Sequence, residues 1–93
     1  MSLVGVRDEF LASRAGSGDE RAFAELARRY DGLLRTALRY RSVAIEPEDL
    51  HQEALIGLHF ACRSFDRARG CRFASWAKRC VHQAILRNRR SIV

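Results

Sequence analysis

The side chains with the clearest chemistry lie on one predicted helix near the C-terminus, over residues 72–90. At 100° per residue, one flank of this helix carries an indole, an amide and three guanidinium groups: Trp76, Arg79, Gln83, Arg87 and Arg90. Guanidinium groups neutralise phosphates, an indole stacks on an unpaired base, and an amide hydrogen-bonds to a base edge. This flank is therefore typical of a nucleic-acid interface. The alternative for Trp76 is a core aromatic with a half-exposed edge.

The same helix has an apolar face that should position this flank. Its members recur at helical spacing and are predicted to enter the core: Phe73, Ala77, Cys80, Val81, Ala84 and Ile85. Leu86 falls on the polar side, where it can contact a thymine methyl group or a base face. A single exposed leucine is also ordinary on a protein surface. The basic loop 66–71, turning at Gly70, precedes the helix and adds Arg69. Arg72 stands where the helix begins.

A second helix, predicted over residues 46–65, carries a different kind of surface. Pro47 suits its first turn, and its core stripe comprises Leu50, Ala54, Gly57, Leu58, Ala61 and Phe65. The opposite side comprises Asp49, Gln52, Glu53, Ile56, Phe60 and Arg63. Two large apolar residues among acids and an amide indicate a protein-binding patch. The alternative is that a neighbouring segment covers Ile56 and Phe60.

The distribution of charge also separates an acidic N-terminal part of the chain from a basic C-terminal part. Residues 1–53 hold eight Arg against ten Asp and Glu, whereas residues 54–93 hold nine Arg and Lys against one Asp. A basic half suits a polyanion, and the acidic half suits a basic partner or is simply a solvated face. Cys62, Cys71 and Cys80 form no paired motif, so we expect no metal site, and a reducing cytosol is the expected setting. No segment resembles a membrane span.

Composition and length predict a single all-α domain, 1–93, without a sheet. Its three to four helices would comprise an N-terminal segment 1–18 with a short helix, a helix over 19–42, and the helices 46–65 and 72–90. Asp19 or Ser17 can cap the helix over 19–42. No phosphate loop, nucleophile elbow, HExxH motif or clustered carboxylate pair is present, so we expect neither catalysis nor a cofactor.

Several runs resemble the second conserved region of bacterial RNA polymerase sigma factors. They are DLHQEALIGL at 49–58, FDRARG at 65–70, FASWA at 73–77 and QAI at 83–85, similar to the family's DLxQEGxIGL, FDxxRGxxF, FSTYA and RQAI. The run GDERAFAELARRY at 18–30 resembles the opening of that region in alternative sigma factors. The order and spacing of these runs agree over about residues 8–90.

The resemblance implies two partners for this chain. Core RNA polymerase would dock through the clamp helices of its largest subunits on a surface matching Asp49, Gln52, Glu53, Leu55 and His59, to which the apolar patch adds Ile56. The non-template strand of the minus-ten promoter element would meet Phe73, Ser75, Trp76, Arg79 and Cys80. Gln83 and Leu86 match residues that contact the upstream, double-stranded edge of the minus-ten element in the family, and Arg87 matches a basic neighbour on the same helix. Arg69 and Arg72 complete the predicted DNA-binding set.

The chain departs from primary sigma factors at the strand-opening positions. Cys71 replaces an aromatic residue, Arg79-Cys80 replaces a tryptophan pair, and His82 replaces an arginine. These changes suggest an alternative sigma factor with a different melting capacity. No helix-turn-helix region for the minus-thirty-five element is present, so the sequence is either an excised domain or a region-two-only version. The other function left open is an interaction module that binds polymerase or an anti-sigma factor without engaging DNA.

Overall fold

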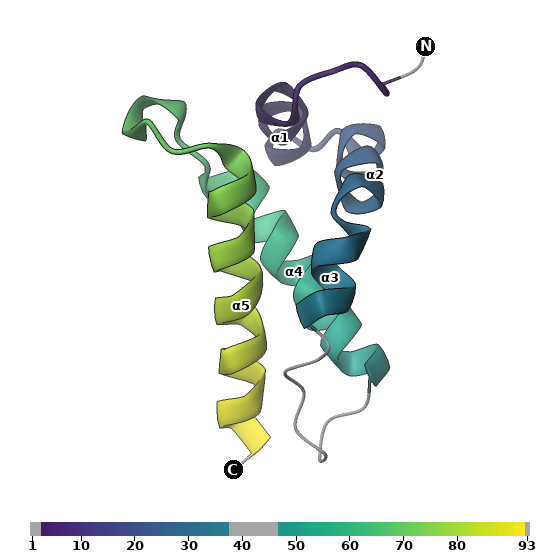
Figure 1. The fold of residues 1–93 in the computed structure, drawn as a ribbon, viewed down its shortest axis with the longest axis vertical. Helices are drawn as coiled ribbons and strands as arrows, with labels where there is room; N and C mark the ends of the chain where they lie inside the picture. Colours follow the sequence, from purple (N-terminus) through teal and green to yellow (C-terminus); the bar gives the residue numbers. More distant parts are fainter. Residues whose placement is uncertain (1–2, 38–46, 93) are drawn as a thin grey trace.

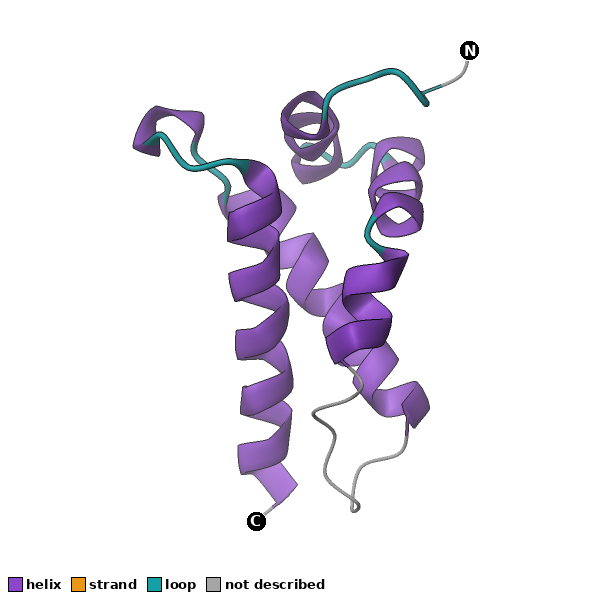
Figure 2. Cartoon of the chain, in the orientation of Figure 1, coloured by secondary structure: helices purple, strands orange, loops and turns teal. Residues whose placement is uncertain are grey.

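All regular secondary structure in the described part of the chain is helical. The structure, a computed structural model, describes residues 3–37 and 47–92, and no strand occurs among them (Figure 2). The helices are α1 (Asp8–Gly16), α2 (Glu20–Arg29), α3 (Asp31–Ala37), α4 (Pro47–Ser64), the short 3-10 helix η2 (Arg67–Arg69) and α5 (Phe73–Ile92). The predicted all-α class is confirmed.

The two longest helices, α4 and α5, form the main packing interface of the molecule. Figure 1 shows α5 running along one side, with α4 crossing it obliquely and α1 and α2 lying next to each other at one end. The loop with η2 joins the end of α4 to the start of α5 near α1. The N-terminal helices are therefore placed beside the beginning of the predicted DNA-binding helix.

The core collects one face from each of these helices. Its largest fully buried side chains are Phe73, Leu11, Leu26, Leu34, Leu58 and Val81. Every residue predicted for the apolar face of α5 is buried, which confirms that part of the sequence reading. Burying aliphatic and aromatic side chains of this size stabilises the fold by about 1.5–3 kcal/mol each. With so few large residues, the packing between the helices must be close.

Two glycines permit that close packing. A Cβ on Gly57 of α4 would lie 2.9 Å from Cα of Val81 and 3.0 Å from the carbonyl oxygen of Cys80. A Cβ on Gly16, the last residue of α1, would lie 2.7 Å from the carbonyl oxygen of Cys62. Atoms cannot approach that closely, so these positions need hydrogen in place of a side chain. They set how near α5 and α1 lie to α4.

The prediction of one continuous helix over residues 19–42 is wrong. The structure has α2 ending at Arg29 and α3 beginning at Asp31, with Tyr30 between them; residues 38–42 lie outside the described residues. Asp31 and Gly32 are weak helix formers, which makes this the place where the helix is most easily interrupted. The predicted cap is confirmed for Asp19, whose Oδ1 accepts hydrogen bonds from the backbone N–H groups of Arg21 and Ala22.

Candidate nucleic-acid and protein interfaces

The apolar pair on α4 is exposed to solvent. Ile56 is 58% exposed and Phe60 is 53% exposed, so none of the segments within residues 3–37 and 47–92 covers them. Gln52 and Arg63 lie at helical spacing from this pair and are exposed as well, and Glu53 is half-buried. Large apolar side chains ringed by polar groups are the usual composition of a protein-binding surface. We call Gln52, Glu53, Ile56, Phe60 and Arg63 the α4 patch.

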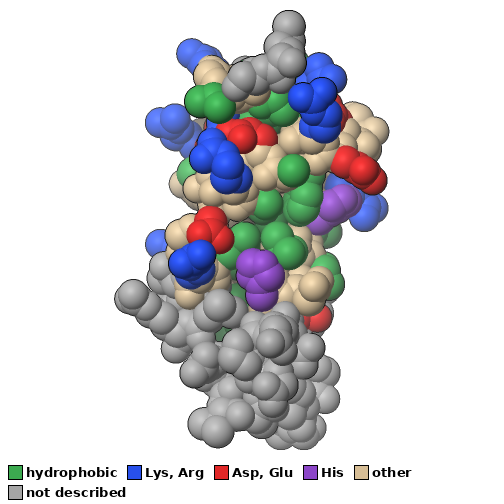
Figure 3. Space-filling model, turned by 90° about the vertical axis from the view of Figure 1, so that its right-hand side faces the viewer, with side chains coloured by type: hydrophobic (Ala, Val, Ile, Leu, Met, Phe, Trp, Pro, Cys, Tyr) green, Lys and Arg blue, Asp and Glu red, His purple; other side chains and the backbone are tan. Residues whose placement is uncertain are grey.

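Other residues predicted to bind polymerase are partly engaged within the fold. Leu55 is half-buried and packs against the core. His59 is exposed, and its ring lies 5.0 Å from that of Phe23 on α2 in a tilted arrangement. The side chain of Asp49 lies outside the described residues. In Figure 3, hydrophobic side chains reach the surface among basic, acidic and histidine side chains, so this face of the molecule is mixed in character.

Most residues predicted to bind DNA lie on the solvent side of α5 and its preceding loop. Six of them are exposed: Arg69, Arg72, Ser75, Arg79, Gln83 and Leu86. The side chain of Arg87 lies outside the described residues. Gly70 has φ of 74°, which confirms the predicted turn at a residue that tolerates the left-handed region. The loop therefore brings two arginines next to the first turn of α5.

Two residues in the predicted DNA-binding set are in the core and correct that prediction. Phe73 is fully buried, with its ring 5.8 Å from Tyr30 and 5.3 Å from Phe65, and Cys80 is buried beside α4. Both lie on the α5 face that the periodicity assigned to the core, whereas the resemblance assigned them to DNA by position alone. In this structure neither side chain is available to a strand on the surface.

Trp76 is held at the border between core and solvent. Its Nε1–H donates a hydrogen bond to Oγ of Ser64 at 3.1 Å, and that hydroxyl donates to the carbonyl oxygen of Phe60 at 2.8 Å. The indole is half-buried and packs against the core. It also lines a small hollow with Arg69 and Cys71 from the preceding loop. Trp76 is therefore a core aromatic with a half-exposed edge, and the exposed part of its ring is still open to stacking on a base.

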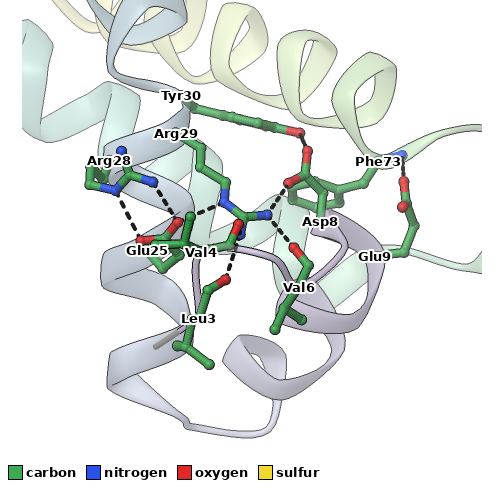
Figure 4. Close-up of polar contacts among 10 residues, drawn as sticks. All are labelled: Leu3, Val4, Val6, Asp8, Glu9, Glu25, Arg28, Arg29, Tyr30 and Phe73. Carbon is green, nitrogen blue, oxygen red and sulfur yellow. Dashed lines mark hydrogen bonds and ion pairs between the residues drawn. The ribbon is translucent and has the colours of Figure 1, made fainter. Parts of the chain in front are cut away.

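A clasp near the N-terminus was missed by the sequence reasoning (Figure 4). Arg29 donates hydrogen bonds to the carbonyl oxygens of Leu3 at 2.6 Å and Val4 at 2.9 Å, and also to that of Val6. The same guanidinium pairs with Asp8 at 2.8 Å and with Glu25 at 2.7 Å. We call Arg29, Asp8, Glu25 and Tyr30 the Arg29 clasp. It fixes the chain before α1 against α2.

The clasp shifts the pKa of its members in directions that follow from the contacts. Hydrogen bonds from Arg28 and then Arg29 lower the pKa of Glu25 to about 2. Burial, followed by the bond that the Tyr30 hydroxyl donates to Asp8 at 2.6 Å, raises the pKa of Tyr30. Asp8 and then Glu25 raise the pKa of Arg29. The charged forms of Glu25 and Arg29 are thus stabilised by partners of opposite sign, whereas the hydroxyl of Tyr30 is kept in its neutral form.

A further unpredicted contact joins α1 to α5. The carboxylate of Glu9 accepts a hydrogen bond from the backbone N–H of Phe73 at 2.9 Å, across 64 residues of sequence (Figure 4). One signal for it exists in the sequence. Cys71 and Arg72 precede α5 and neither is a good helix cap, so its first N–H groups need acceptors from elsewhere.

The three cysteines are free, and no disulfide joins them. Burial, followed by the proximity of Cys80, raises the pKa of the Cys62 thiol to about 11. Among residues 3–37 and 47–92, no three His, Cys, Asp or Glu side chains are grouped to hold a metal ion. In the same part of the chain, no helix has the length and apolar character needed to cross a membrane.

Comparison with known proteins identifies a family for most of the chain. A family model described as Sigma-70 region 2 matches residues 26–92. This range includes α4, the loop with η2, and α5, which together carry the α4 patch and the exposed basic flank. It starts after α1 and within α2, so Asp8 and Glu9 precede it. A search of curated protein sequences found no match.

Proposed function

Because the chain belongs to the sigma-70 region 2 family, we propose that it binds core RNA polymerase and recognises and helps melt the minus-ten promoter element. One observation carries the proposal. Trp76 is pinned half-open at the start of α5, with Arg72 before it and Arg79 and Gln83 exposed along the same helix. A fixed indole beside guanidinium groups suits an unstacked base and its phosphates.

The α4 patch supplies the polymerase side of this proposal. Ile56 and Phe60 offer an exposed apolar centre, and Glu53 adds negative charge beside it. Apolar contact gives affinity, and charge complementarity selects a basic partner surface. The clamp helices of the largest polymerase subunits are the partner that the family resemblance implies. In this arrangement polymerase and DNA occupy different helices, so both can bind together.

The departure at Arg79-Cys80 bears on strand opening. Cys80 is buried, so of the two positions only Arg79 is presented to solvent. A guanidinium attracts phosphate but does not fill an opened base step as an indole does. We therefore assign capture of melted DNA mainly to Trp76, with a weaker wedge than in a primary sigma factor. No covalent step is assigned to this chain, because the chemistry of transcription belongs to polymerase.

The test measures binding of a fluorescein-labelled, single-stranded minus-ten oligonucleotide by fluorescence anisotropy. The chain is mixed with core polymerase, and core polymerase alone gives the background. Trp76→Ala should weaken binding by about 5- to 150-fold, since base stacking contributes about 1–3 kcal/mol. Trp76→Phe retains an aromatic face but not the bond to Ser64, so its affinity should lie between those of the parent chain and Trp76→Ala. Equal affinity of Trp76→Ala and the parent chain at several salt concentrations would exclude the stacking role.

A second function is favoured by the exposure of the α4 patch. The chain would then be a sigma-like interaction module that binds polymerase or an anti-sigma factor without engaging DNA. The apolar pair Ile56 and Phe60 is the observation that supports this alternative. The two functions separate in the same experiment. Capture by polymerase with no gain in oligonucleotide binding over core polymerase alone would favour the interaction module.

A further inference from the structure

The start of α5 is capped by a residue from the opposite end of the chain. In an α-helix the first N–H groups have no partner within the helix. The N–H of Phe73, at the first position of α5, donates to Oε2 of Glu9 at 2.9 Å. A carboxylate at this end also complements the positive end of the helix dipole. Glu9 therefore contributes to where α5 begins.

Glu9 is itself held in place. It lies in the first turn of α1, whose inner face of Leu11, Ala12 and Ala15 is buried, and whose last residue Gly16 abuts the backbone of α4. The preceding residue, Asp8, pairs with Arg29 at 2.8 Å and accepts from the Tyr30 hydroxyl at 2.6 Å. The acceptor for α5 is thus fixed by the Arg29 clasp on one side and by α4 on the other.

Phe73 receives this support through both its backbone and its side chain. While its N–H is bound by Glu9, its ring packs 5.8 Å from that of Tyr30, a member of the clasp. Arg72 is its chain neighbour, and Ser75 and Trp76 lie within the following turn. The open hollow between α1 and the loop before α5 is lined on one side by Glu9 and on the other by Arg72. Displacing Glu9 would remove one of the contacts that hold the segment carrying the proposed base-binding residues.

We infer that Glu9 is a positioning residue for DNA capture: by capping Phe73 it fixes the first turn of α5, so that Arg72, Ser75 and Trp76 meet the strand in one arrangement. This rests on the proposed function. The contribution comes from α1, which precedes the residues 26–92 matched by the family model. The clasp acts on the same turn through Asp8 and Tyr30, and makes the N-terminal segment a brace for the DNA-binding helix.

The experiment compares Glu9→Ala with Glu9→Gln, whose side-chain carbonyl still accepts a hydrogen bond. Asp19→Ala is the matched control, because it removes a carboxylate cap from α2 at the other end of α1. Amide hydrogen exchange at Phe73 and anisotropy with the labelled minus-ten oligonucleotide, in the presence of core polymerase, are measured for each full chain. Urea unfolding reports the loss of global stability, so that Glu9→Ala and Asp19→Ala are compared at equal folded fraction.

Glu9→Ala should accelerate exchange at Phe73 about tenfold and weaken oligonucleotide binding about three- to tenfold, the range expected for loss of one cap. Glu9→Gln should have an exchange rate at Phe73 and an oligonucleotide affinity close to those of the parent chain. Asp19→Ala, compared at equal folded fraction, should keep both quantities within about twofold of the parent values. Parent-level binding by Glu9→Ala would overturn the positioning role while leaving the proposed function intact. A parent chain that adds no binding to core polymerase would overturn the proposed function and this inference with it.

Discussion

Arg29 and Asp8 form an ion pair of 2.8 Å although 21 residues separate them in the sequence. The same guanidinium also binds Glu25 and three backbone carbonyl groups of residues 3–6. Its side chain is only 17% exposed, whereas that of Arg28, which also pairs with Glu25, is 63% exposed. The two neighbouring arginines therefore offer a direct comparison between a structural and a surface cation.

Arg29→Met should destabilise the fold by about 2 kcal/mol or more, because it leaves partly buried acceptors without a charged donor. Arg28→Met removes an exposed pair to the same carboxylate and should change stability little. Urea unfolding followed by circular dichroism gives the midpoint for each variant. Equal midpoints for the two variants would contradict the clasp as the main tie between the N-terminus and α2.

Glu53→Arg should reduce capture of the chain by isolated polymerase clamp helices. The substitution reverses a charge within the α4 patch, and a basic partner would then meet a like charge. Glu53→Gln keeps the shape and removes only the charge, so its loss of capture should be smaller and should fade as salt is added. Pull-down or surface plasmon resonance at two salt concentrations measures both. Unchanged capture by Glu53→Arg would place the polymerase contact on another surface.

Gly57→Ala should destabilise the molecule by about 1–3 kcal/mol, the usual cost of overpacking a closed interface. Its new Cβ would lie 2.9 Å from Cα of Val81 and 3.0 Å from Cβ of Ala84, so α4 and α5 must separate. Gly32→Ala is the control, since its Cβ meets nothing within 4 Å; it should stabilise α3 by about 0.4–1 kcal/mol. Thermal unfolding compares the two. A Gly57→Ala variant as stable as the parent would mean that the interface between α4 and α5 can accommodate an extra methyl group without cost.

Stability should decline as the solution is acidified from pH 4.5 to about 2, in part because of Glu25. Its folded-state pKa is lowered from 4.5 to about 2, so its ion pairs stabilise the fold above pH 4.5 and are lost as the pH falls through the folded value. Glu25→Gln has no such charge to lose, and its unfolding midpoint should depend less on pH in this window. Parallel pH profiles of the two proteins would refute the assignment.

Native thiol reactivity should be confined largely to Cys71. This residue is exposed, whereas Cys62 and Cys80 are buried, and burial raises the pKa of both thiols. Iodoacetamide at pH 8, analysed by peptide mass, should modify Cys71 first and all three cysteines only in urea, because the thiolate is the reactive form. Rapid modification of Cys62 in the native protein would show that α4 and α5 separate in solution.

Periodicity predicted the parts of the structure that depend on local sequence. The core face of α5 follows directly from helical spacing, and so does the exposure of Ile56 and Phe60 on α4. The resemblance to sigma factors located the same helices and is confirmed as a family, but its position-by-position transfer assigned Phe73 and Cys80 to DNA although both are buried. Where the two arguments disagreed, the helical face was the better guide to burial.

The contacts that could not be predicted join residues far apart in sequence. Arg29 stands beside the apolar face of a helix, where a solvated charge is ordinary, and nothing local pairs it with the carbonyl of Leu3. Tyr30, which lies at the break between α2 and α3, likewise has partners outside its own helices, namely Asp8 and Phe73. Such contacts are decided by how the helices meet, which helical spacing within one segment does not specify.

The bond between Glu9 and Phe73 also has a consequence for biosynthesis. At a translation rate of about 5–20 residues per second, the 64 residues between them take on the order of 3–13 s to emerge. During that interval the carboxylate of Glu9 lacks the N–H donor that it has in the folded chain. The first turn of α5 can therefore acquire this cap only after most of the chain has been synthesised.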